Sequence, residues 1–485
     1  MTSAFPEGLE PSLLWKNFNI LTSTPRCSGE EESVLRKIET WADGLGFARE
    51  RDETGNLLVR VPGTPGREER GVTVIQGHVD MVCEKNAEVD FDFGCQGINV
   101  VLEGDWVTGV GTTLGADNGI GVAAGMAVAE DPEAVHGPLE LLFTIDEETG
   151  MTGAWGLKPG FLTGTRMLNL DTEEQGAIYV GCSGGGDVMS RFSPDLTAPI
   201  GDVALRMTVK GLVGGHSGLD IHENRANAIK LVGRALARLQ AAGVSLQLAD
   251  LAGGSKRNAV PREASATLIL AREQVPVVRG LIERLLPELH AEFQPTDPGL
   301  TVVTEEVAVP AQAWSQSFSA RLVAVILANP SGVASMSRDV PGLVETSNNL
   351  GVVRMTDGAV ELVNCTRSTV GSALESLRAS ITALHALAGG SVELDEAYPG
   401  WQPDLNSGLL KVAQGVHQEL FGAEAEIKAV HAGLECGLLG QHYPGLEMIS
   451  IGPDIRGAHS PDERLSVPSS QDFYVFVKGI LAALD

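Results

Sequence analysis

Short apolar runs that end in a histidine or a carboxylate recur through the first part of the chain. His78-Val79-Asp80 follows the run Val72-Thr73-Val74-Ile75, and Glu147-Glu148 follows Leu141-Leu142-Phe143-Thr144-Ile145. Runs this short and this apolar are typical of strands buried in a sheet that is covered on both faces. Because ligands in open α/β sheets bind beyond the carboxyl ends of the strands, we expect these polar side chains to meet at one edge.

Three further residues stand in the same setting: Asp117 in Gly115-Ala116-Asp117-Asn118-Gly119, Asp171 after Met167-Leu168-Asn169-Leu170, and His459 after Met448-Ile449-Ser450-Ile451. Two imidazoles and several carboxylates suit zinc or manganese, and one extra carboxylate can bridge two ions. Asp80 lies two residues beyond His78, where it can accept one imidazole N–H and leave the other nitrogen for a metal. The pattern predicts a two-metal hydrolase.

Each residue alone also has a simpler interpretation. Asp80 can be an exposed turn residue, and Asp117 can cap the small-residue helix that follows it. Asp146, Glu147 and Glu148 can be a solvated strand end. On an extended backbone two adjacent glutamates point apart, which predicts one ligand and one general base. The glycines around Asp117 are expected to make room for the metal pair.

Composition limits the possible partners. The chain has 485 residues and a net charge of −28, which argues against nucleic-acid or anionic-membrane binding and is explained by solubility. The sequence shows no signal peptide and no apolar stretch that could span a bilayer. The six cysteines form no Cys-x-x-Cys pair and are expected to be reduced thiols in a cytoplasmic protein.

The pattern of elements predicts an insertion. Helix and strand alternate over residues 11–171, with helices at 30–45 and 120–130 and strands at 56–61 and 72–75, and the alternation breaks at Gly181-Cys182-Ser183-Gly184-Gly185-Gly186. Two strand–loop–helix units follow, with strands at 203–210 and 359–365 and helices at 224–241 and 371–388. A helix at 405–420 then resumes the first style. We predict an α/β mixed-sheet catalytic domain over 1–189 and 396–485, and an inserted α+β lid over 190–395.

The motifs together resemble a known family. The chain is similar to the aminoacyl-histidine dipeptidase branch of the aminoacylase–carnosinase superfamily of co-catalytic zinc peptidases, almost from end to end. The motifs that carry the resemblance are His78-Val79-Asp80, Gly115-Ala116-Asp117-Asn118-Gly119, Asp146-Glu147-Glu148-Thr149-Gly150, Asn169-Leu170-Asp171-Thr172-Glu173, Gly214-Gly215-His216-Ser217-Gly218, Gly253-Gly254-Ser255-Lys256-Arg257-Asn258, His431-Ala432-Gly433-Leu434-Glu435 and Gly457-Ala458-His459-Ser460-Pro461.

The resemblance implies a zinc-peptidase catalytic domain of the phosphorylase/hydrolase-like type that binds two divalent ions, Zn²⁺ first, with Mn²⁺ and Co²⁺ as alternatives. His78 and Asp171 would hold one ion, Glu148 and His459 the other, and Asp117 would bridge them through a turn with a cis peptide at Asp117-Asn118. Asp80 would orient His78, and Glu147 would be the general base.

The inserted segment would supply the contacts to substrate. By the same resemblance His216 stabilises the oxyanion, and Asn258 and Arg367 hold the free carboxylate. Outside that segment, Glu435 would meet the amine of the substrate. The implied substrates are short unblocked peptides, notably Xaa-His dipeptides such as β-alanyl-histidine, because Asp at position 171 goes with an unblocked amino terminus. The lid is expected to mediate a homodimer.

Three alternatives remain at this stage. An aminoacylase or a tripeptide aminopeptidase of the same superfamily is the first. Gly181-Cys182-Ser183-Gly184-Gly185 matches the nucleophile elbow of serine hydrolases, but the helix which that motif requires does not follow it. A relative that binds metal or peptide without catalysis would lack a ligand or the base, and none is missing.

Overall fold

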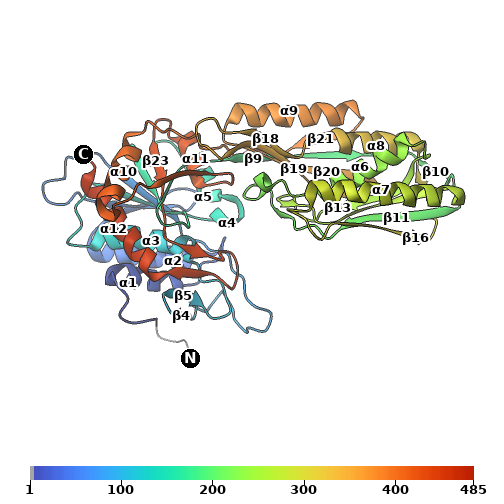
Figure 1. Ribbon diagram of the computed structural model, residues 1–485. Coiled ribbons are helices and arrows are strands. Elements are labelled where there is room, and N and C mark those ends of the chain that lie inside the picture. Colours follow the sequence, from blue (N-terminus) through green and yellow to red (C-terminus); the bar gives the residue numbers. More distant parts are fainter. Residues whose placement is uncertain (1–4) are drawn as a thin grey trace. The chain divides into compact units, whose positions relative to one another are not determined.

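The computed structural model describes residues 5–485, which form two compact units. Unit 1 comprises the residues up to Gly181, Trp401–Ala429 and Leu434–Asp485, and unit 2 comprises Cys182–Gly400 and Val430–Gly433. The sequence pattern placed the first crossing at residue 190. The structure places it at 182, because the strand Gly184–Phe192 pairs with strands of unit 2. In Figure 1 both units combine a sheet with helices.

Unit 1 is built on a mixed sheet. Within the described residues its strand order is β1-β2-β6-β3-β7-β23-β8-β22. The strands are β1 (Ala48–Arg51), β2 (Leu57–Val61), β6 (Leu139–Thr144), β3 (Thr73–His78), β7 (Arg166–Asn169), β23 (Glu447–Ser450), β8 (Ala177–Cys182) and β22 (Glu426–Val430). The central strands β6, β3, β7 and β23 are parallel, and β1, β2 and β8 pair antiparallel.

The register of the parallel strands fixes where their ends lie. His78 pairs with Thr144, and Gln76 pairs with Asn169, which in turn pairs with Ser450. The carboxyl ends of β3, β6, β7 and β23 therefore share one edge of the sheet. At or just beyond the ends of β3, β6 and β7 lie the predicted residues His78, Asp80, Glu147, Glu148 and Asp171, as expected for an open α/β sheet.

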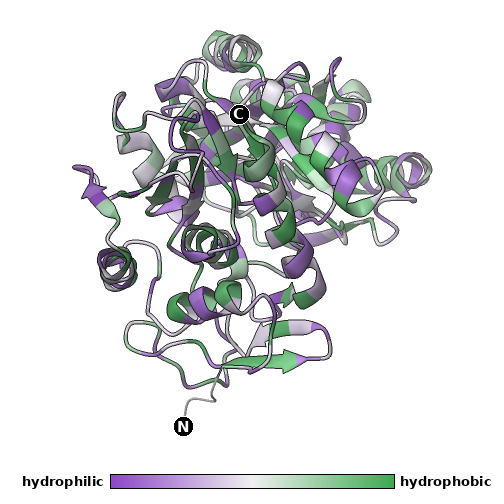
Figure 2. Cartoon of the chain, turned by 90° about the vertical axis from the view of Figure 1, so that its left-hand side faces the viewer, coloured by the Kyte–Doolittle hydropathy of each residue, from purple (hydrophilic) through white to green (hydrophobic). Residues whose placement is uncertain are grey.

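The helices of unit 1 bury apolar residues, apart from the short α4. They are α1 (Ser12–Thr22), α2 (Glu32–Leu45), α3 (Ala116–Glu130), α4 (Glu147–Gly150), α5 (Thr152–Gly156), α10 (Gly408–Phe421), α11 (Glu435–His442) and α12 (Val467–Ala483). In α2 the residues Val34, Leu35, Ile38 and Ala42 recur at helical spacing and join the core, and Gly46 ends the helix in a left-handed conformation. Figure 2 shows apolar and polar residues side by side on the helices of this unit.

A small sheet of unit 1 carries the last part of the predicted site. Its order is β24-β25-β5-β4, formed by β24 (Ile455–Arg456), β25 (Arg464–Ser466), β5 (Trp106–Gly109) and β4 (Val100–Glu103). His459 lies in the loop between β24 and β25. It is therefore further from β23 than the sequence suggested.

Unit 2 contains a second sheet of order β16-β11-β15-β13-β19-β20-β9-β21, with β18 beside β19. Its strands are β16 (Thr301–Val307), β11 (Val203–Lys210), β15 (Ala264–Leu270), β13 (Gln247–Gly253), β19 (Val344–Thr356), β20 (Ala359–Ser368), β9 (Gly184–Phe192), β21 (Ser391–Leu394) and β18 (Gly332–Met336). Short pairs are β10 (Leu196–Thr197) with β17 (Ala313–Trp314) and β12 (Gly215–His216) with β14 (Ala259–Val260).

The helices of unit 2 are α6 (Ala228–Ala241), α7 (Val275–Phe293), α8 (Gln316–Ala328) and α9 (Gly371–Leu387), with 3-10 turns η1 (Ile221–Glu223) and η2 (Arg272–Gln274). The predicted helix 224–241 begins only at 228, because the Asn227 side chain accepts the N–H groups of Ile229 and Lys230 as a cap. The predicted strand 359–365 continues to Ser368, so Arg367 lies on a strand and not in a loop.

The prediction that all six cysteines are reduced is wrong for Cys27 and Cys83. These two residues form a disulfide, with Cα atoms 5.7 Å apart. The loop that carries Cys27 runs beside the end of β3, where Cys27 pairs with Met81 in an isolated bridge. This contact links residues far apart in the sequence, so no local spacing signals it. Among residues 5–485, no helix is both long and apolar enough to cross a membrane.

Candidate metal centre and substrate-binding residues

His78 and Asp80 lie at and just beyond the end of β3, where the sequence placed them. His78 Nδ1 is 3.3 Å from Asp80 Oδ1. The Asp80 carboxylate also accepts the Ser28 hydroxyl at 2.7 Å and the N–H groups of Glu147 and Glu148 at 3.1 and 3.2 Å. Burial alone would raise the pKa of Asp80, but His78 and these donors lower it to about 2. Asp80 is thus an ionised acceptor that lies beside His78 and binds the first turn of α4.

Asp117 lies between the two predicted histidine ligands. Its Oδ1 atom is 3.2 Å from His78 Nε2, and its Oδ2 atom is 3.1 Å from His459 Nε2. The turn that presents Asp117 opens α3, and its Asp117-Asn118 peptide is cis, as the resemblance implied. His459 itself adopts a left-handed backbone with φ of 62°. Each oxygen of Asp117 therefore faces a different imidazole, which is the arrangement that a bridging carboxylate needs.

The remaining predicted ligands complete two groups around Asp117. Asp171 Oδ1 is 3.2 Å from His78 Nε2, and Glu148 Oε2 is 3.1 Å from His459 Nε2. Ligand atoms about 2.0 Å from one tetrahedral ion lie about 3.3 Å apart, close to these separations. Ligand atoms of His78, Asp117 and Glu148 also lie within 4.8 Å of one another. The donors, nitrogen and carboxylate oxygen, suit divalent zinc or manganese.

The electrostatics of the cluster also fit cations. Hydrogen bonds to Asp117 and Glu148 raise the pKa of His459 to about 11, although burial opposes the shift. Burial, with neighbouring Asp117 and Glu148, raises the pKa of Asp171 to about 6. Glu148 Oε1 is buried and has no hydrogen-bond partner among the described residues. A divalent ion would neutralise this concentration of negative charge and give that oxygen a partner.

Glu147 is placed differently from the expectation. The prediction assumed an extended backbone, but Glu147 and Glu148 open the helical turn α4. Their side chains therefore point in different directions around the helix axis. Burial raises the pKa of Glu147 well above its ordinary value, and the neighbouring carboxylates of Asp171 and Glu435 add to the shift. A carboxylate whose proton affinity is raised in this way suits a group that both takes up and returns a proton.

Glu435 lies inside unit 1 with 0% of its surface exposed. Its Oε2 atom accepts the Gln76 amide at 2.6 Å and the Thr144 hydroxyl at 2.7 Å, while Oε1 has no hydrogen-bond partner among the described residues. Burial raises its pKa to about 7. Gln76 and Thr144 belong to β3 and β6, so Glu435 joins two of the strands that carry the site.

In unit 2, the backbone defines the protonation state of His216. Its Nδ1 atom accepts the N–H groups of Gly218 at 3.2 Å and Leu219 at 3.0 Å. Burial and the charge of Arg367 lower the pKa of His216. The imidazole is therefore neutral, and its proton resides on Nε2. A neutral Nε2–H donor is the form that can bind a carbonyl oxygen as negative charge develops there.

Arg367 and Asn258 lie near His216 within the same unit. Arg367 is 7% exposed and donates from Nη1 to the Tyr398 hydroxyl at 3.1 Å and from Nε to the Ser217 hydroxyl at 3.5 Å. Asn258 is exposed, and its carbonyl oxygen accepts the Ser217 N–H at 2.8 Å. Unit 2 thus brings its three predicted substrate-binding residues together around Ser217.

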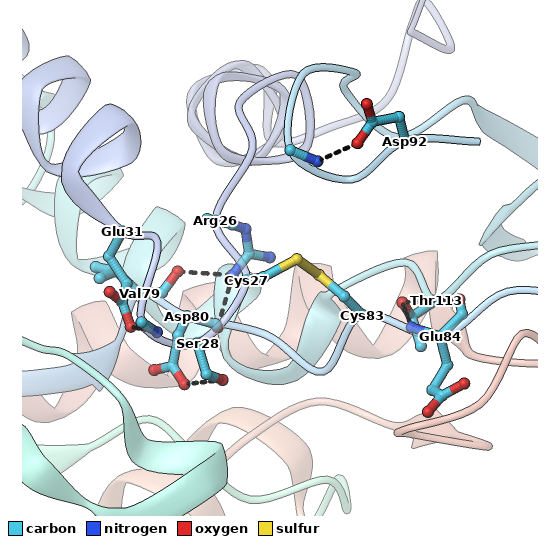
Figure 3. The surroundings of a disulfide bond; sticks show 12 residues. Arg26, Cys27, Ser28, Glu31, Val79, Asp80, Cys83, Glu84, Asp92 and Thr113 are labelled. Carbon is cyan, nitrogen blue, oxygen red and sulfur yellow. Dashed lines mark hydrogen bonds between the residues drawn. A yellow bond between two sulfur atoms is a disulfide. The ribbon is translucent and has the colours of Figure 1, made fainter.

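Sequence reasoning missed two buried charges that hold the site. Arg26 donates to the carbonyl oxygens of Val79, Asp80 and Gly115, and Figure 3 shows it between the disulfide and Asp80. Glu463 accepts backbone N–H groups of the turn before Asp117. A methyl group on Gly115 would lie 2.4 Å from Arg26 Nη2. The glycine at 115 therefore makes room for Arg26 and not, as the sequence predicts, for the metal ions.

The mixed-sheet α/β fold and the acidic cluster, which is suited to metal ions, are those of a metal-dependent peptidase. The chain belongs to peptidase family M20/M25/M40, whose model matches residues 74–483. It is 42% identical over 474 residues to the cytosol non-specific dipeptidase of Escherichia coli (strain K12), which covers 98% of each chain.

Solved structures agree with this assignment. The aminoacylhistidine dipeptidase of Vibrio alginolyticus superposes with a TM-score of 0.91 at 41% identity, covering 98% of this chain and 97% of that one. Aminopeptidase PepT of Bacillus cereus ATCC 10987 shares the fold, with a TM-score of 0.57 at 15% identity over 98% and 99% of the two chains. The predicted resemblance, the fold class and the enzyme class, a peptide-bond hydrolase of the dipeptidase type, are confirmed.

Proposed function

We propose that this protein is a two-metal dipeptidase that cleaves short unblocked dipeptides, with Xaa-His peptides such as β-alanyl-histidine among its best substrates. The observation that carries the proposal is the placement of Asp117 between His78 and His459, with one carboxylate oxygen facing each ring. The names of the similar enzymes, a non-specific dipeptidase and an aminoacylhistidine dipeptidase, support the substrate class.

His78 and Asp171 would hold one ion and His459 and Glu148 the other, with Asp117 shared. When bound, such a pair supplies positive charge that polarises the scissile carbonyl and makes a water molecule more acidic. Zn²⁺ is the first choice for this donor set, and Mn²⁺ or Co²⁺ are alternatives. Asp80 keeps His78 in the tautomer whose Nε2 atom is available as a ligand.

Glu147 would remove the proton from the attacking water and return it to the leaving amine. Its raised pKa fits both steps, because the group must hold the proton between attack and release. The metal pair would lower that pKa, so the free carboxylate is available at neutral pH.

Unit 2 would act as a lid that supplies the other contacts. His216, neutral and carrying its proton on Nε2, would donate to the developing oxyanion. Arg367 would clamp the carboxylate of the substrate together with Asn258, which limits the substrate to one residue beyond the scissile bond. Glu435, which belongs to unit 1, would interact with the substrate amine.

We further propose a homodimer formed through unit 2. We also propose a cytoplasmic location, which the name of the Escherichia coli relative, a cytosol dipeptidase, supports. Whether His216 serves its own chain or a partner is tested by mixing His216→Ala chains with Glu147→Ala chains. Recovery of activity indicates a shared site. Absence of recovery in verified heterodimers indicates that each chain is self-sufficient.

A substrate panel tests the function. We expect β-alanyl-histidine and other Xaa-His dipeptides to be hydrolysed faster than N-acetyl amino acids and tripeptides, because Arg367 and Asn258 would bind a carboxylate at dipeptide length. Faster cleavage of N-acetyl amino acids would replace the dipeptidase by an aminoacylase. Faster cleavage of tripeptides would favour an aminopeptidase.

A further inference from the structure

A buried carboxylate outside the ligand set binds the turn that presents Asp117. Glu463 is 2% exposed, and its two oxygens accept four consecutive backbone N–H groups. These are Leu114 at 2.7 Å, Gly115 at 2.9 Å, Ala116 at 2.7 Å and Asp117 at 3.3 Å. The N–H groups that lead into a helix have no partner within it, so Glu463 satisfies those of the turn before the regular part of α3 from a distant part of the chain.

Arg26 binds the same turn from its carbonyl side. The guanidinium is 1% exposed and donates from Nη2 to the Gly115 oxygen. From Nη1 it donates to the carbonyl oxygens of Val79 at 3.0 Å and Asp80 at 2.9 Å. The Gly115 residue therefore has its N–H bound by Glu463 and its C=O bound by Arg26. Arg26 also ties this turn to the segment that follows His78.

Glu463 is anchored on the segment that presents the second histidine. It lies four residues after His459, and its N–H donates to the Ser460 oxygen at 3.0 Å. Its own carbonyl oxygen accepts the Thr108 hydroxyl at 2.7 Å, next to the pairing of β25 with β5. One residue thus connects the His459 loop to the Asp117 turn, although the two ligands are 342 positions apart.

We propose that Glu463, with Arg26 opposite it, is a positioning residue that fixes the place of Asp117 relative to His459 and His78. This inference rests on the proposed metal pair. A bridging carboxylate must present its two oxygens to two ions at once, so a small rotation of the turn loosens both ions together. Residues that hold metal ligands in place typically change metal affinity by about 10- to 100-fold when they are replaced.

A purely structural role predicts something different. A carboxylate that only caps α3 would, when replaced, lower the unfolding temperature and leave the metal affinity of the folded protein unchanged. Metal affinity and the magnetic coupling between two Mn²⁺ ions therefore separate the two roles, because both depend on the position of Asp117.

The test compares Glu463→Gln with Asp462→Asn in the full chain. Both remove one negative charge, but Asp462 is exposed and its neighbour Glu463 holds the turn. Each protein is stripped with a chelator and titrated with Mn²⁺, and coupling is read by electron paramagnetic resonance. We expect Glu463→Gln to weaken binding of both ions by about 10- to 100-fold and to reduce the coupling. We expect Asp462→Asn to stay within about twofold of the wild-type affinity.

The outcomes are distinguishable. Wild-type affinity and coupling in folded Glu463→Gln, or an equal loss in Asp462→Asn, would overturn the inference and leave the dipeptidase proposal standing. A wild-type chain that binds no pair of ions would overturn the metal proposal instead. If Glu463→Gln does not fold, Arg26→Lys provides the same test, since lysine keeps the charge but cannot span the three carbonyl oxygens.

Discussion

The disulfide between Cys27 and Cys83 should stabilise unit 1 mainly by restricting its unfolded chain. The bond closes a loop of 56 residues. Loop-closure entropy for this length corresponds to about 4 kcal/mol at 25 °C. The hydrogen bonds from Arg26 to Val79 and Asp80, and from Ser28 to Asp80, join the same two segments and do not depend on the sulfurs (Figure 3). Reduction should therefore leave the folded site in place and act on stability.

Urea denaturation of oxidised and reduced protein measures this effect. With a denaturant slope of about 3 kcal/mol per molar, the midpoint for unit 1 should fall by about 1.3 M on reduction, while kcat in the absence of urea stays the same. Cys27→Ser should behave like reduced protein, and Cys95→Ser, which changes an exposed thiol outside the bond, should behave like the wild type. Equal midpoints for oxidised and reduced protein would refute the reasoning.

Two further predictions concern the individual sites. Arg367→Lys should raise KM for dipeptides by roughly 10- to 100-fold, because it loses a charged hydrogen bond worth about 1.5–3 kcal/mol. The control Arg354→Lys changes an arginine that pairs with Glu361 and should leave KM unchanged. Steady-state kinetics of both variants measures this, and an unchanged KM in Arg367→Lys would exclude the carboxylate clamp. Metal-free protein should melt at a lower temperature at pH 9 than at pH 6. In the folded protein the pKa of His459 is raised to about 11. The stability that protonated His459 contributes is therefore fully present below about pH 6.5, the pKa of the unfolded side chain, and is lost as the pH rises towards 11. A melting temperature at pH 9 that equals or exceeds the value at pH 6 would contradict this.

The parallel strands and the residues after them were predictable because their signals are local. The apolar runs before His78, Glu147 and Asp171 mark buried strands, and parallel strands bring their carboxyl ends to one edge. The order of the motifs then identified the family. The structure adds that each carboxylate oxygen of Asp117 faces a different histidine, which the sequence motifs alone do not reveal.

Other features depend on pairs that are distant in sequence and carry no local signal. The Cys27–Cys83 bond, the contact of Glu463 with the Asp117 turn and the contact of Arg26 with Gly115 arise only when the chain folds. The predicted bounds of an element were wrong where a side chain accepts backbone N–H groups at the start of a helix, as in α6. The regular part of α3 follows a turn in which Asp117 and Asn118 have non-helical backbone angles, close to the predicted start at 120, and Glu463 accepts N–H groups of that turn. Local capping by distant residues cannot be deduced from periodicity.

The most direct test of the account is the kcat and metal content of Glu147→Gln. This variant keeps the shape of the side chain and removes the group that would move the proton, while the five proposed ligands remain. We expect kcat for β-alanyl-histidine to fall by about 10²- to 10⁴-fold, with two divalent ions still bound per chain. Full activity in the variant, or a chain that holds fewer than two ions, would contradict the assignment of Glu147 as the base of a two-metal dipeptidase.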